Sequence, residues 1–97
     1  MKSKDGFKRI TAQAGTLESS DCLVTCSLQD NLEIEYRGPD TIEILRERTE
    51  KLVKETTSRY GLKGAYISIQ DNGALEVTMK ARLETAVERC LEVANHE

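Results

Sequence analysis

The stretch CLVTCSLQDNLEIEYR, residues 22–37, decides the fold because apolar and polar side chains alternate along both of its halves. Alternation with a period of two is typical of strands that bury one face. We therefore predict strands over residues 22–28 and 31–37. Only two residues separate the runs, which favours an antiparallel hairpin between them.

A long helix is predicted after the second strand. Gly38 and Pro39 end the strand, and Asp40 followed by Glu43 resembles a capping box. Gly61 supplies a stop. The apolar stripe of this helix comprises Ile42, Leu45, Thr49, Leu52, Val53, Thr56 and Tyr60.

Residues 65–70 alternate again and predict a third strand. The step Asn72-Gly73 permits a hairpin turn into a fourth strand, but apolar residues recur every four positions from Leu75 to Leu91. We favour a helix that begins between residues 74 and 81. The expected class is α+β, a two-layer sandwich in which a small, mostly antiparallel sheet of order β-β-α-β-α is covered by two helices.

Composition limits the classes of function. The chain has 97 residues, 38% of them hydrophobic, which is the size of one domain and leaves little room for a deep substrate cavity. The net charge of −3 argues against nucleic-acid binding. No window is apolar enough for a membrane span, so a cytoplasmic protein is expected. Residues 1–21 show no sustained period and are expected to form a flexible head before a domain of residues 22–97.

Three cysteines and one histidine raise the question of a metal site. Cys22, Cys26, Cys90 and His96 could be offered as zinc ligands, but the cysteines fall on the apolar faces of predicted elements. Buried thiols that act as small hydrophobic side chains are the favoured interpretation, and no metal is expected. Lys80, Arg82 and Arg89 are interpreted as a solvated helix face, with a phosphate or a partner subunit as the alternative.

Two separated segments carry a resemblance to a known family. AGTLESSD (residues 14–21) and DNGALEVTMKARLE (residues 71–84) resemble the prosthetic-group segment and the second signature of citrate lyase acyl carrier proteins, the gamma subunits of that complex. Lys80 stands where the second signature usually has Arg. A malonate decarboxylase subunit shares the layout, although Thr16, Leu17 and Glu18 point to the citrate branch. A citramalate lyase subunit would look nearly the same.

The resemblance implies a carrier that is not itself an enzyme. Its cofactor would be 2'-(5''-phosphoribosyl)-3'-dephospho-coenzyme A, attached through a phosphodiester to Ser19, with Ser20 as the fallback. Glycine often follows the modified serine in the family, whereas Ser20 does here. The arm would present acetyl and citryl thioesters to the alpha and beta subunits of citrate lyase. A holo-carrier-protein synthase (the transferase) and an acetylating ligase would be further partners.

The residues beside Ser19 suggest how this segment is recognised. We expect Glu18 and Asp21 to help the transferase or a partner subunit recognise the loop, with ordinary turn chemistry as the equal alternative. A small interaction module with a Ser-rich turn is the rival function from another class.

Overall fold

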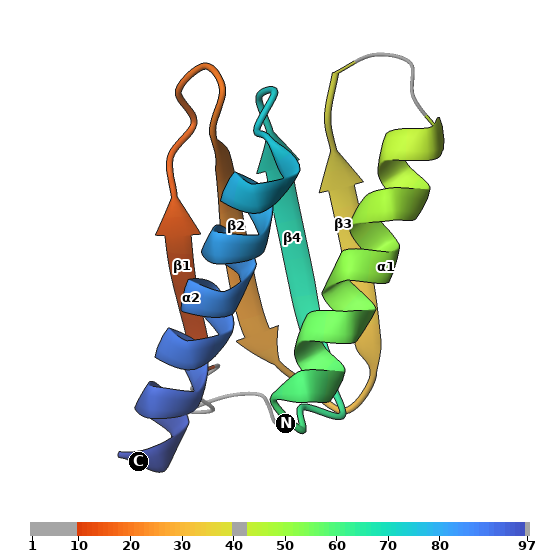
Figure 1. The fold of residues 1–97 in the computed structure, drawn as a ribbon. Coiled ribbons are helices and arrows are strands. Elements are labelled where there is room, and N and C mark those ends of the chain that lie inside the picture. Colours follow the sequence, from red (N-terminus) through yellow and green to blue (C-terminus); the bar gives the residue numbers. More distant parts are fainter. Residues whose placement is uncertain (1–9, 40–42, 97) are drawn as a thin grey trace.

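Four strands form one sheet, and two helices pack on a single face of it (Figure 1). This computed structural model describes residues 10–39 and 43–96. The elements are β1 (Thr11–Gly15), β2 (Cys22–Leu28), β3 (Leu32–Arg37), α1 (Glu43–Arg59), β4 (Ala65–Asp71) and α2 (Glu76–Asn95). The predicted α+β class with two layers is confirmed, and the segment after Asn72-Gly73 is a helix. The proposed cap residue Asp40 lies outside the described residues.

The strand order β1-β2-β4-β3 contradicts the predicted hairpin of residues 22–28 and 31–37. β4 lies between β2 and β3; it runs antiparallel to β2 and parallel to β3. The link from β2 to β3 crosses the start of β4 at Gly64, where an added Cβ would lie 2.2 Å from the carbonyl oxygen of Gln29. The inward side chains of β4 are all buried, as expected for a strand paired on both sides, whereas β3 at the edge of the sheet exposes Glu33 and Arg37.

Residues 11–15, predicted as part of an irregular head, form an edge strand paired with β2. Ala12 and Ala14 face the helix side, while Gln13 donates to the Thr25 hydroxyl on the opposite face at 2.9 Å. Alternation was present in the sequence, but alanine gives a weak hydrophobic signal. The element order is therefore β-β-β-α-β-α, with one strand more than predicted.

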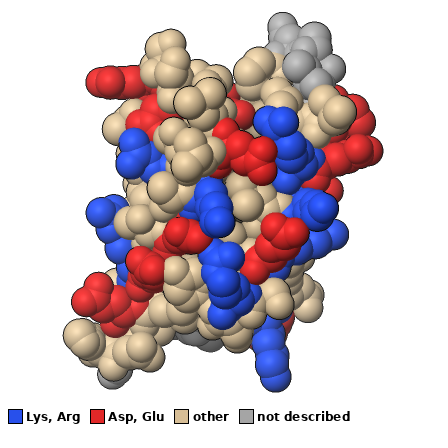
Figure 2. Space-filling model, in the orientation of Figure 1, with Lys and Arg blue, Asp and Glu red and all other residues tan. Residues whose placement is uncertain are grey.

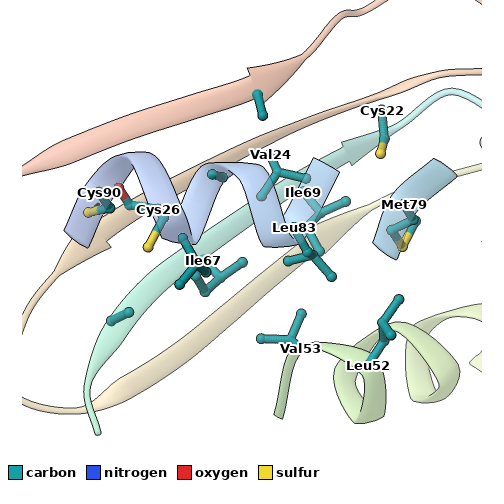
Figure 3. Packing of buried hydrophobic residues seen from close by; sticks show 14 of the residues in the cluster. Cys22, Val24, Cys26, Leu52, Val53, Ile67, Ile69, Met79, Leu83 and Cys90 are labelled. Carbon is teal, nitrogen blue, oxygen red and sulfur yellow. Dashed lines mark hydrogen bonds between the residues drawn. The ribbon is translucent and has the colours of Figure 1, made fainter. Parts of the chain in front are cut away.

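The core between the layers is aliphatic (Figure 3). α2 packs on β1 and β2, and α1 packs on β3 and α2. Side chains of Val24, Ile67, Ile69 and Leu83 meet between the sheet and α2, all fully buried. The largest buried side chains also include Val53, Val87, Thr56, Cys22, Cys26 and Cys90.

The outer face of the helices carries interspersed positive and negative side chains (Figure 2). Two ion pairs join the helices. Arg48 Nε lies 3.7 Å from Glu76 Oε1, and Arg59 bonds Glu84. Because these pairs are exposed, each adds at most about 1 kcal/mol. Within the described ranges, no helix has the length and hydrophobicity needed to cross a bilayer.

Replacing Leu83 by Ala should lower the free energy of unfolding by about 2–5 kcal/mol, because a fully buried side chain is lost and a cavity remains. Val77 on the same helix is 71% exposed and provides the matched control. Val77→Ala should change stability by no more than about 0.5 kcal/mol. Urea denaturation measures both, and equal effects of the two substitutions would contradict this core assignment.

Candidate functional site

Three connections meet at one end of the sheet, the upper end in Figure 1. They are the β1–β2 loop (residues 16–21), the β4–α2 turn (residues 72–75) and residues 38–39 after β3. The two segments singled out in the sequence, residues 14–21 and 71–84, therefore lie together in space. Their contacts define the candidate site.

Asp21 holds the β1–β2 loop to α2. Its carboxylate accepts hydrogen bonds from Arg82, with Nε 3.0 Å from Oδ1 and Nη2 3.1 Å from Oδ2. It also accepts from the Thr16 hydroxyl at 2.7 Å and from the Cys22 backbone N–H at 2.7 Å. These charge-assisted bonds, above all those from Arg82, hold the pKa of Asp21 well below its usual range. The carboxylate is the point where both ends of the loop and α2 are joined.

Asn72 attaches the tip of the loop to the β4–α2 turn. Its backbone carbonyl accepts from the Ser20 N–H at 2.8 Å, and its own N–H donates to the Asp21 carbonyl at 2.9 Å. The side-chain amide donates to the Leu17 carbonyl. The sequence predicts Asn72 as part of a turn and gives no sign of these bonds to the loop, since an Asn-Gly step is typical of ordinary turns.

The Asp71 side chain fixes the β4–α2 turn by hydrogen bonds. Its Oδ1 accepts from the N–H groups of Gly73 and Ala74 at 3.0 and 2.9 Å, and its Oδ2 accepts from the buried Tyr36 hydroxyl at 2.7 Å. Burial, followed by this bond to a carboxylate, raises the pKa of Tyr36. Gly38 packs directly against the Tyr36 ring, since a Cβ added at this glycine would lie 2.2 Å from the Tyr36 hydroxyl oxygen. Asp71 thus hydrogen-bonds the β4–α2 turn to the end of β3, and Gly38 packs against the same Tyr36 hydroxyl.

The two candidate serines differ in backbone and surroundings. Ser20 has φ +66°, the left-handed region that favours glycine. Ser19 has no such constraint, and its side chain is exposed. It lines an open groove together with Gly38, Pro39, Asp71 and Asn72.

Of the two interpretations of Asp21, its contacts favour a role within the turn, because its side chain is only 14% exposed and both of its oxygens accept hydrogen bonds from within the chain. Glu18 is exposed, so its role in recognition stays a prediction. Two of the three cations interpreted as a solvated face make internal contacts. Arg82 binds Asp21, and Arg89 Nη1 donates to the Gln13 carbonyl at 2.8 Å, whereas Lys80 is exposed.

The cysteines are buried in the core, which matches their interpretation as small hydrophobic side chains. Burial raises the pKa of Cys22 to about 11 and that of Cys26 to about 12, so both remain thiols at neutral pH. His96 is exposed just beyond α2. In the part of the chain that the structure describes, no three His, Cys, Asp or Glu side chains are grouped to bind a metal ion.

Replacing Arg82 by Gln removes the guanidinium and should raise the pKa of the Asp21 carboxyl toward its usual value. The ion pair stabilises the fold fully above the unfolded pKa of Asp, about 3.9, and this contribution disappears as pH falls through the lower folded value. Carbon-13 NMR titration should therefore find a lower pKa for Asp21 in the native chain than in Arg82→Gln, where only the hydrogen bonds from Thr16 and Cys22 still lower it. Lys80→Gln, which removes an exposed charge from the same helix, should leave the titration unchanged. A similar Asp21 pKa in all three proteins would contradict the pairing.

Comparisons with known proteins give consistent matches across most of the chain. The family described as "ACP: Malonate decarboxylase delta subunit (MdcD)" matches residues 9–90. The citrate lyase acyl carrier protein of Halothermothrix orenii is 41% identical over 81% of this chain and 84% of its own length. Those of Treponema denticola and Streptococcus mutans are 37% and 39% identical, over 84% and 86% of this chain and 92% and 82% of their own lengths.

The same fold occurs in a solved structure. A chain in the crystal structure of a Pseudomonas malonate decarboxylase hetero-tetramer in complex with malonate has a TM-score of 0.68 and 22% identity. The match covers 86% of this chain and 88% of that chain. From the extent and identity of its relatives, this chain belongs to the acyl carrier protein family that includes the citrate lyase acyl carrier proteins.

Proposed function

We propose that this chain is the acyl carrier subunit of a citrate lyase and that Ser19 bears its prosthetic group. The observation that carries the proposal is the placement of Ser19, an exposed hydroxyl on a loop that Asp21 and Asn72 fix to the body of the protein. A modifying enzyme can reach such a hydroxyl without unfolding the domain. The attached group would be 2'-(5''-phosphoribosyl)-3'-dephospho-coenzyme A, linked through a phosphodiester.

The residues around Ser19 suit this attachment. The groove beside it is open, and among the described residues it is lined by Gly38, Pro39, Asp71 and Asn72, which leaves Ser19 room for a bulky substituent. The resemblance described above implies glycine after the modified serine, and Ser20 at that position has the positive φ that glycine adopts without strain. This correspondence supports Ser19, rather than Ser20, as the attachment residue.

The chain itself would contribute position and not bond cleavage. When bound, the group supplies a terminal thiol that holds an acyl unit as a thioester. The domain anchors the arm at one end of a packed sheet, and Asp21 keeps the anchoring loop in one conformation. Tethering maintains the acyl unit at an effective concentration in the millimolar range for short flexible linkers. The alpha and beta subunits of citrate lyase, in the cytoplasm, would carry out the chemistry.

A malonate decarboxylase carrier is the second candidate. It is favoured by the description of the matching family and by the structural neighbour. The citrate assignment is preferred because the curated relatives at 37–41% identity are citrate lyase acyl carrier proteins. Citramalate lyase remains compatible with the same residues. Purified alpha and beta subunits of each complex, supplied with the loaded carrier, distinguish these assignments by the acid that they consume.

Substitution of the two serines should separate the site from its neighbour. After production with the native transferase enzymes, Ser19→Ala should show no adduct in its intact mass, since the ester oxygen is absent. Ser20→Gly should be modified as fully as the unaltered chain, because glycine accepts the backbone conformation at φ +66°. Fragmentation of the peptide spanning residues 14–22 locates the adduct.

Circular dichroism confirms that both variants are folded. An adduct of full stoichiometry on Ser19→Ala would overturn the assignment of the site. An unmodified native chain, tested with a transferase that modifies an established citrate lyase carrier, would overturn the carrier function and favour an interaction module.

A further inference from the structure

A pocket lies between the N-terminal halves of the two helices, next to the groove that Ser19 lines. Its volume is about 230 Å³, and Pro39 and Asp71 line both the pocket and the groove. The two hollows are therefore neighbours, with these residues between them. The apolar part of the pocket lining consists of Pro39, Leu45, Leu52, Ala74 and Met79.

The size of the pocket limits what can enter it. Sites for drug-sized ligands occupy about 300–1,000 Å³, so this pocket takes a smaller group. A nucleotide or a complete coenzyme is too large, whereas a two-carbon acyl thioester with the last atoms of its arm is small and mostly apolar. A free acid is a poor match, since the lining combines apolar side chains with two carboxylates, Asp71 and Glu76, against the single cation Arg48.

One buried hydroxyl in the pocket is weakly bonded. Thr49 is 4% exposed, and within the described residues its hydroxyl donates only to the Met79 sulfur, at 3.5 Å. A thioether is a weak acceptor, so this donor can turn to a better one at little cost. The carbonyl oxygen of a thioester is such an acceptor. Arg48 and Glu76 flank the mouth as an exposed pair at 3.7 Å that separates easily.

We propose that this pocket between α1 and α2 receives the acyl thioester end of the arm attached at Ser19. The proposal rests on the proposed function, because it concerns the end of that same arm. Leu45, Leu52 and Met79 would cover the acyl carbons, and Thr49 would donate to the carbonyl oxygen. The seated thioester is withdrawn from water and released when a partner subunit binds the loaded end of the domain.

Chemical attachment of an arm tests the pocket without the transferase. Ser19→Cys places an exposed thiol beside three buried ones whose pKa values are raised, so a haloacetamide reacts selectively at position 19. The reagent carries a pantetheine-length chain ending in an S-acetyl group. Iodoacetamide alone, which adds no chain, gives the matched control, and the intact mass verifies a single addition.

Methyl NMR spectra should shift at Leu45, Leu52 and Met79 with the acetylated arm and not with the short control. Ala74→Leu, which fills the pocket, should abolish these shifts, whereas Val77→Leu on the exposed face should retain them. Hydrolysis of the thioester should be at least about threefold faster in Ala74→Leu, the ratio expected if the end is seated roughly two thirds of the time. Thr49→Val should give an intermediate rate.

Unchanged methyl spectra with the long arm, or equal hydrolysis rates in the Ala74→Leu and Val77→Leu proteins, would overturn the pocket proposal. Its failure is distinct from that of the proposed function. Adduct formation by the transferase decides whether Ser19 is the natural attachment residue, and these spectra decide where the arm rests once it is attached.

Discussion

The ion pair of Asp21 and Arg82 is the contact on which the arrangement of the functional end depends. It links a loop near the start of the chain to a helix 61 positions later, and it brings together the two segments that resemble family signatures. Both oxygens of Asp21 accept hydrogen bonds, from Arg82, Thr16 and the Cys22 N–H, so the carboxylate joins three separate parts of the functional end. The two signatures are thus parts of one physical unit.

The contacts between the Ser19 loop and the body of the domain meet two requirements of a carrier protein. The attachment residue has to be accessible, yet the loop that contains it has to leave the domain in a defined direction. Fixing the loop at its two ends through Asp21 and near its tip through Asn72 leaves Ser19 exposed on a restrained backbone. In the proposed carrier, mobility would belong to the attached arm, and the body of the protein would need only a small aliphatic core to support it.

Sequence patterns predicted what depends on local periodicity. They predicted β2, β3, β4, both helices and an aliphatic core that contains the cysteines. They failed for strand pairing, because insertion of β4 between β2 and β3 is a long-range property that no local spacing reveals. β1 was not predicted because its inward residues are alanines, which give only a weak hydrophobic alternation.

The candidate site was predicted in part for the same reason. The serine segment and the charged second segment were both visible, and opposite charges at positions 21 and 82 were available as a signal. Their contact required knowledge that α2 packs beside the β1–β2 hairpin. The pocket between α1 and α2 was beyond sequence reasoning, since side chains from four separate parts of the chain line it.

The central claim is that Asp21 acts by holding the Ser19 loop to Arg82 and not by contacting the modifying enzyme. A double-mutant cycle on the rate of modification by the transferase tests it most directly. The account predicts that Asp21→Asn and Arg82→Gln each slow modification and that the double variant is no slower than either alone. Asp21→Asn slowing the reaction while Arg82→Gln has no effect would contradict it, because the transferase would then read the carboxylate itself.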